Sequence, residues 1–135
     1  MRNLIKRENV LYPELSYLVC GLCFVTQNRL GRFRSERQYA DFLEGLFQEH
    51  RVKYQREVSI PQSFSGEHAN RNRPDFIVED NIIVDLKAKR LISRDDYFQM
   101  RRYLVSSGKE LGLLVNFRPR YVVIKRVLGP RRNHS

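Results

Sequence analysis

The feature that most constrains the fold is the run from Leu111 to Phe117, which is apolar at nearly every position. A strand with one face in water alternates apolar and polar residues, so a continuous apolar run is expected of a strand covered on both faces. Such a strand belongs to a sheet with helices packed against it. We therefore predict an α/β domain in which a mixed central β-sheet is flanked by α-helices.

The remaining elements follow in the order helix, helix, three strands, helix, two strands. Helices are expected over residues 12–30, 35–50 and 93–108, and strands near residues 52–60, 73–79, 81–88, 111–117 and 121–127. Pro13 suits the first turn of a helix, and Ser35 with Gln38 and Ser93 with Asp96 have the spacing of capping boxes. The last strand is expected at an edge of the sheet, and residues 62–72 are expected to form a mobile loop or a poorly formed hairpin tip.

Length and composition fit one domain. The chain has 135 residues, of which 41% are hydrophobic, enough for one packed core. We expect a single domain over residues 1–135, with a core at 10–127 and a basic tail at 128–135. No stretch approaches the ~20 apolar residues of a membrane-spanning helix, and the first residues lack the apolar region of a signal peptide, so a cytoplasmic protein without a membrane partner is expected.

The chain is strongly basic, because 25 Lys and Arg stand against 15 Asp and Glu, for a formal net charge of +10. This charge favours an anionic partner, most often nucleic acid, with an anionic membrane surface as the rival. Cys20 and Cys23 have C-x-x-C spacing, but no second cysteine pair completes a four-thiolate site, so we expect them in the core. His50, His68 and His134 lack the spacing of zinc ligands and are expected at the surface.

The residues with the clearest chemical potential lie in the third predicted strand. Asp85 and Lys87 are two residues apart, so on a strand they project from one face while Leu86 points into the core. Charges at the end of an apolar strand are costly unless they are paired, metal-bound or solvated. A surface ion pair between Asp85 and Lys87 would explain them without any function.

A second carboxylate favours a functional interpretation over a simple surface ion pair. Asp75 follows Pro74 on the preceding strand, ten residues before Asp85. In an unbulged antiparallel pair, Asp75 lies opposite Asp85 only if the connection has an odd number of residues, such as 79–81. Two carboxylates so placed can hold Mg²⁺, with Mn²⁺ as a substitute, and nucleases use this arrangement. Lys87 would then orient and deprotonate water, or stabilise charge on the phosphate.

Several stretches of the chain together match the sequence pattern of a known family. They are residues 11–17, 30–31, 36–39, 73–80, 83–88 and 112–117, together with Gln99, Tyr103 and Leu104. With Pro74-Asp75 and Asp85-Leu86-Lys87, this layout resembles the GxxExxY branch of the PD-(D/E)XK nuclease-like superfamily from about residue 10 to residue 127. The resemblance implies a restriction-endonuclease-like core.

The resemblance also implies roles for individual residues. Asp75 and Asp85 would bind metal, Lys87 would assist catalysis, Glu36 would reach the same centre from the preceding helix, and Gln99 would project from the following one. Glu36 is therefore a candidate metal ligand and, with the other four, a candidate catalytic residue. One position departs from the family pattern, because Phe33 stands where the name-giving glycine is expected.

Arginines gather in segments flanking this centre, as a rim that binds phosphates requires. Arg34, Arg73, Arg90 and Arg102 are the candidate nucleic-acid contacts. We therefore predict a Mg²⁺-dependent nuclease that acts on DNA or, as a second choice, RNA. The alternatives are an inactive nucleic-acid-binding module and a subunit of a nuclease complex, and a homodimer stays open.

Overall fold

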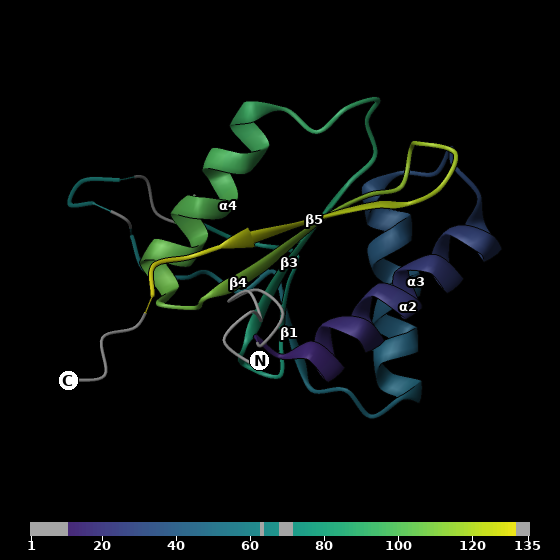
Figure 1. The fold of residues 1–135 in the computed structure, drawn as a ribbon, viewed down its shortest axis with the longest axis horizontal. Helices are drawn as coiled ribbons and strands as arrows, with labels where there is room; N and C mark the ends of the chain where they lie inside the picture. The colour runs from purple at the N-terminus through teal and green to yellow at the C-terminus, as the bar shows by residue number, and fades with distance from the viewer. Residues whose placement is uncertain (1–10, 63, 68–71, 132–135) are drawn as a thin grey trace, which may run out of the picture.

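In the computed structural model, which describes residues 11–62, 64–67 and 72–131, the strands form one five-stranded sheet (Figure 1). The strands are β1 (Tyr54–Arg56), β2 (Phe76–Val78), β3 (Ile82–Lys87), β4 (Leu111–Asn116) and β5 (Val123–Leu128), and their order in the sheet is β1-β2-β3-β4-β5. The β3–β4 pair is parallel and the other neighbours are antiparallel. The sheet is therefore mixed, as predicted, and β5 lies at its edge.

Helices cover both faces of the sheet (Figure 1). Helices α2 (Pro13–Leu30) and α3 (Glu36–Glu49) pack on one face, and α4 (Arg94–Ser107), which connects β3 to β4, packs on the other. Leu111, Leu113 and Val115 belong to the cluster under α2 and α3, whereas Leu114 belongs to the cluster under α4. The apolar run is thus explained as predicted, because alternate residues fill opposite cores.

The predicted helix starts are confirmed. Pro13 stands at the first turn of α2, and Ser35 with Gln38 forms a complete capping box at α3. Ser93 and Asp96 form a complete capping box at the start of α4. Each box satisfies backbone amides that a helix start would otherwise leave unpaired, so short local motifs determine where these helices begin.

The strands are shorter than predicted at several ends. The first was expected over 52–60, but β1 ends at Arg56 because Glu57 adopts a left-handed conformation with φ of 53°. Such a backbone turns the chain out of the sheet. The last was expected from Tyr121, but β5 begins at Val123, because Val122 is held instead by a hydrogen bond from its amide to Gln27 Oε1.

The expected mobile loop at 62–72 is anchored where the structure describes it, since Glu67 and Asn72 are buried and hydrogen-bonded to each other. Residues 63 and 68–71 and the end of the basic tail, 132–135, lie outside the described residues, with His68 and His134. Cys23 is buried and Cys20 partly buried, and both are free thiols in the core, as predicted.

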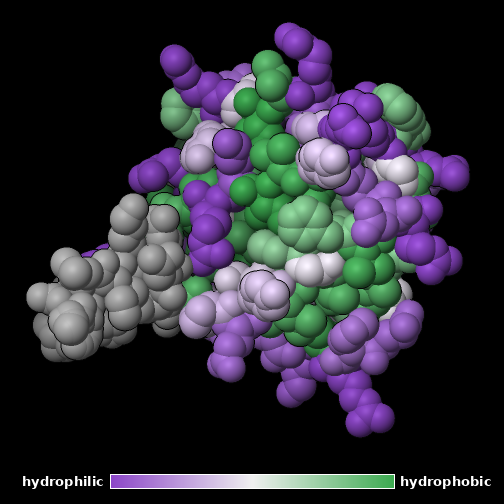
Figure 2. All heavy atoms as spheres, turned by 45° about the vertical axis from the view of Figure 1, so that its right-hand side comes forward, coloured by the Kyte–Doolittle hydropathy of each residue, from purple (hydrophilic) through white to green (hydrophobic). Residues whose placement is uncertain are grey.

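Helix α2 also leaves apolar side chains in solvent. Tyr17 is 84% exposed, Phe24 48% and Val25 41%. Figure 2, which brings the right-hand side of Figure 1 forward, shows apolar side chains gathered in the middle of this face and hydrophilic ones around them. Among the described helices, none is both long and apolar enough to cross a membrane.

Candidate active site

Asp75 and Asp85 meet where β2 begins and β3 approaches its end. The hairpin register pairs Phe76 with Val84, so the next pair along the two chains is Asp75 with Asp85. The connection, residues 79–81, has an odd number of residues. The prediction that these two carboxylates face each other across one hairpin is therefore confirmed.

Hydrogen bonds hold both carboxylates in place. Leu86 N donates to Asp75 Oδ2 over 2.6 Å, and Asp75 N donates to Asp85 Oδ1 over 3.2 Å. Burial and the charge of Asp85 raise the pKa of Asp75 to about 8, and the Leu86 hydrogen bond only partly offsets them. A cation between the carboxylates would relieve this repulsion, and their oxygens are the donors that a hard divalent ion prefers. The donor set therefore fits Mg²⁺.

Lys87 projects from the same face of β3 as Asp85, as predicted. Its Nζ lies 3.2 Å from Asp85 Oδ2 and 3.7 Å from Asp96 Oδ1, and it donates to Gln99 Oε1 over 3.3 Å. Burial lowers the pKa of Lys87, but the charge and hydrogen bond of Asp85 outweigh it, so the pKa lies above its ordinary value. Lys87 is thus an ammonium held beside the carboxylates by three acceptors.

Helix α4 supplies the side chains on the far side of Lys87. Gln99 projects from this helix and accepts from Lys87 Nζ, and Asp96 also bonds Lys89 Nζ over 2.8 Å. Burial together with the charges of Asp85 and Asp75 raises the pKa of the Tyr103 hydroxyl. The Asp96 carboxylate therefore both caps α4 and pairs with Lys87 of β3, which fixes the start of the helix relative to the strand.

Glu36 is near the centre but is engaged elsewhere. Its Oε2 accepts a hydrogen bond from Ala88 N over 3.3 Å, at the exit of β3. Within the described residues, no group of three or more His, Cys, Asp or Glu side chains is placed to hold a metal ion. The structure therefore brings Asp75 and Asp85 together as a pair, with the Glu36 carboxylate beside them at the exit of β3, where its charge acts to raise the pKa of both Asp75 and Lys87.

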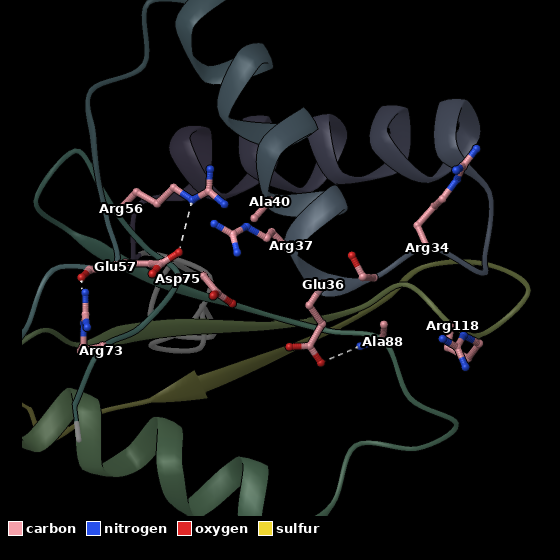
Figure 3. Close-up of a pocket in the computed structure, with 11 residues that line it drawn as sticks. Arg34, Glu36, Arg37, Ala40, Arg56, Glu57, Arg73, Asp75, Ala88 and Arg118 are labelled. Atoms are coloured by element: carbon pink, nitrogen blue, oxygen red, sulfur yellow. Dashed lines mark hydrogen bonds and ion pairs between the residues drawn. The ribbon is translucent and has the colours of Figure 1, made fainter. Parts of the chain in front are cut away.

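Asp75 opens into a cleft of about 700 Å³, which Glu36 also lines. Its charged lining comprises Arg34, Glu36, Arg37, Arg56, Glu57, Arg73, Asp75 and Arg118. Figure 3 shows Arg56, Arg73 and Asp75 at one end, Glu36 and Ala88 in the middle, and Arg34 and Arg118 at the other end. Guanidinium groups flanking carboxylates suit a phosphate chain drawn over a metal-binding pair.

The predicted nucleic-acid contacts divide into two groups. Arg34 and Arg73 line the cleft. Arg90 and Arg102 are not among its lining residues: Arg90 is exposed after β3, and Arg102 Nε lies 3.7 Å from buried Glu67. Glu67 thus engages Arg102 on α4 through an ion pair, which directs its guanidinium away from the cleft.

Arg56 and Arg118 line the cleft but were not singled out from the sequence. Arg118 closely follows the end of β4, and β4 runs parallel to β3, so both strands deliver their carboxyl ends to one edge. Arg56 ends β1 opposite Phe76, next to Asp75. The strand pairing was the available signal, because a basic residue at either position must lie near the carboxylates once the register is known.

Comparisons with known proteins agree with this architecture. A model of the PD-(D/E)XK nuclease superfamily matches residues 13–127. The crystal structure of an alkaline exonuclease from Laribacter hongkongensis is similar at 14% sequence identity and a TM-score of 0.50, over 82% of this chain and 69% of that one. A search of curated proteins gave no match. The similarity in structure supports the fold, and the superfamily match covers most of the chain.

Proposed function

The chain belongs to the PD-(D/E)XK nuclease superfamily, and from this premise we propose that it is a metal-dependent nuclease that hydrolyses phosphodiester bonds of DNA. Membership implies a nucleic-acid substrate, and these nucleases generally use divalent metals. The observation that carries the proposal is the convergence of Asp75 and Asp85, with Lys87 bound to Asp85, where Asp75 lines an arginine-rich cleft.

In this proposal, Asp75 and Asp85 hold Mg²⁺, which Mn²⁺ can replace, and the bound ion supplies Lewis acidity and an acidified water. Lys87 stabilises negative charge that develops on the phosphate, because its ammonium lies beside the carboxylate pair. Gln99 orients Lys87 through its amide oxygen. Glu36 contributes negative charge at the edge of the centre and is the third candidate ligand, with its Oε2 accepting from Ala88 N.

We assign the chain further to the GxxExxY branch, on the motifs around Asp75, Asp85 and Gln99. The departure at Phe33 leaves the approach to Glu36 intact, because Ser35 still caps α3 with a complete capping box. Glu36 therefore starts this helix at the cleft without the glycine of the family pattern.

The test is cleavage of single-stranded and duplex DNA by purified variants with Mg²⁺. Asp85→Asn should reduce the rate to background, and Lys87→Met should reduce it by about 10²- to 10³-fold, because a preorganised charge is lost. Asp95→Asn, an exposed carboxylate on the first turn of α4, is the matched control and should leave the rate unchanged. Full activity of pure, folded Asp85→Asn would refute the assignment.

A second candidate is a nucleic-acid-binding module that does no chemistry. It is favoured by the small number of converging ligands, since in the described part of the chain no group of three or more His, Cys, Asp or Glu side chains is placed to hold a metal ion. Calorimetric titration with Mn²⁺ separates the candidates. Binding that Asp75→Asn abolishes supports the nuclease, and absence of binding to the native protein supports the module.

A homodimer is also proposed, on the apolar side chains that α2 exposes. Phe24 and Val25 lie in solvent next to Leu22 and Cys23, which face the core. Sedimentation equilibrium of the native chain and of Phe24→Glu tests this. A native dimer that Phe24→Glu converts to a monomer would support it, and a native monomer at all concentrations would exclude it.

A further inference from the structure

Phe33 stands out among the exposed side chains near the cleft. It lies on the connector between α2 and α3, three residues before Glu36, and is 75% exposed. The guanidinium of Arg32 lies 5.2 Å from the centre of its ring, and that of Arg118 lies 5.5 Å from it. An aromatic ring that has two cations over it and still keeps 75% of its surface in water offers a platform for a planar, anionic ligand.

A buried tyrosine, Tyr39, holds the connector that carries Phe33 in place. Tyr39 is fully buried, and its hydroxyl donates to Gly31 O and accepts from Arg34 N over 3.3 Å. The Tyr39 ring is stacked on Phe117, with ring centres 4.2 Å apart. One core tyrosine therefore holds both ends of the segment on which Phe33 sits, so the ring is presented on a rigid support.

The connector is also bound to the loop between β4 and β5. Arg32 Nε donates to Arg118 O over 2.9 Å, and Arg118 Nε donates to Arg32 O over the same distance. Gln27 holds this loop in place, because its side chain donates to Phe117 O and Pro119 O and accepts from Val122 N. The two cations over Phe33 are thus held by main-chain hydrogen bonds, and one of them, Arg118, lines the cleft.

We propose that Phe33, with Arg32 and Arg118, forms a stacking platform for an unpaired nucleobase of the substrate; this rests on the proposed function as a nuclease. Arg34 and Arg118 line one end of the cleft (Figure 3), so the platform is continuous with the path to Asp75 and Asp85. A base stacks on the ring while its phosphate meets a guanidinium. A blunt duplex keeps its bases paired, so the platform selects a single-stranded segment or a frayed end.

Binding measured without cleavage tests the platform. The native chain and Phe33→Ala are titrated, with EDTA present, against labelled single-stranded DNA of about 15 nucleotides and against a blunt duplex of the same length. Phe33→Ala should weaken binding to the single strand by about tenfold, which is about 1.4 kcal/mol, because one base loses its stacking partner. Its affinity for the duplex should change by less than about twofold.

Three further variants separate aromatic stacking from general hydrophobic contact and from effects on the fold. Phe33→Leu keeps an apolar side chain and should lose as much as Phe33→Ala, whereas Phe33→Tyr keeps the ring and should bind as the native chain does. Tyr17→Ala, which removes an exposed aromatic from α2, should change neither affinity. Thermal unfolding should be the same for all variants, because both aromatic side chains are exposed.

The proposal is overturned if Phe33→Ala binds the single strand as tightly as the native chain, or if it loses single strand and duplex equally. Native-like binding by Phe33→Leu would also overturn it, since an alkyl group does not stack as an aromatic ring does. These results do not depend on catalysis. Loss of cleavage in Asp85→Asn tests the nuclease proposal separately, and either one can fail while the other holds.

Discussion

The main-chain amide of Asp75 donates a hydrogen bond to Oδ1 of Asp85 over 3.2 Å, so the backbone of one acidic residue ties down the carboxylate of the other. Leu86 N holds the second carboxylate in the same way over 2.6 Å. The fold thus keeps two like charges together in a partly buried site, where they repel each other. This arrangement costs stability in the metal-free protein and prepares the site for a cation.

The first prediction concerns the stability of the metal-free protein against pH. The pKa of Asp75 is raised to about 8, whereas an unfolded chain has a value near about 3.9. Between these values the folded state binds more protons than the unfolded state, so the free energy of unfolding falls as pH rises. One proton accounts for at most about 1.4 kcal/mol per pH unit.

Urea unfolding in EDTA between about pH 5 and pH 8.5 measures this effect. Asp75→Asn carries no titrating carboxyl, so it should lose this slope and be more stable than the native chain at the alkaline end. Asp95→Asn should keep the native slope, because its side chain is exposed and away from the pair. Equal slopes in Asp75→Asn and the native chain would contradict the proposed repulsion.

The second prediction concerns metal. A ligand that binds only the folded state stabilises it, by about 2.7 kcal/mol at a concentration of 100 times its Kd. Mg²⁺ or Mn²⁺ should therefore raise the Tm of the native chain by several degrees, and Asp75→Asn and Asp85→Asn should lose this rise. The rise should be larger at pH 8 than at pH 6, because protons compete with the metal for Asp75. An equal rise in Asp85→Asn would place the metal elsewhere.

Much of the carboxylate pair could be derived from the sequence because its geometry is local. Two residues on one strand share a face at a spacing of two, and one odd-length hairpin determines whether Asp75 faces Asp85. The same holds for the helix starts, because Ser35 and Ser93 bond to residues within one turn. Short-range rules of this kind need no knowledge of the rest of the fold.

Which arginines line the cleft depends on long-range packing. The sequence alone therefore distinguished these arginines poorly from the others. Arg73 and Arg102 are equally basic residues near the motif, yet Arg73 lines the cleft and Arg102 pairs with Glu67 from a distant segment. Arg118 enters through the parallel pairing of β4 with β3, which a single sequence does not reveal. The ion pair between Asp96 and Lys87 was missed for a related reason, because the cap explained Asp96 by itself.

The third prediction separates the two roles of Asp96. Asp96→Asn keeps a side-chain oxygen for the cap but removes the charge beside Lys87 and Lys89, so cleavage should fall by about tenfold. Ser93→Ala removes the hydroxyl that caps α4 and should lower the free energy of unfolding by about 1 kcal/mol while leaving cleavage unchanged. Equal losses of activity in both variants would show that Asp96 acts only through the helix.

The fourth prediction tests how α4 is seated on the sheet. A Cβ on Gly112 of β4 would overlap Sδ of Met100, a fully buried residue of α4 that faces the sheet. Gly112→Ala should therefore lower the free energy of unfolding by about 1–3 kcal/mol, as overpacking does. It should also reduce cleavage, because the displaced helix carries Gln99 away from Lys87.

A double-mutant cycle tests whether the Met100 side chain is the source of the clash at Gly112. Combining Gly112→Ala with Met100→Ala should cost less than the sum of the two single changes, by at least about 0.5 kcal/mol in a double-mutant cycle. Gly21→Ala in α2 is the matched control, because a Cβ there meets no atom within 4 Å, and it should stabilise the helix by about 0.5–1 kcal/mol. Strict additivity of the two core changes would mean that Met100 does not set the distance between α4 and β4, and that the position of Gln99 depends on the Asp96 contacts alone.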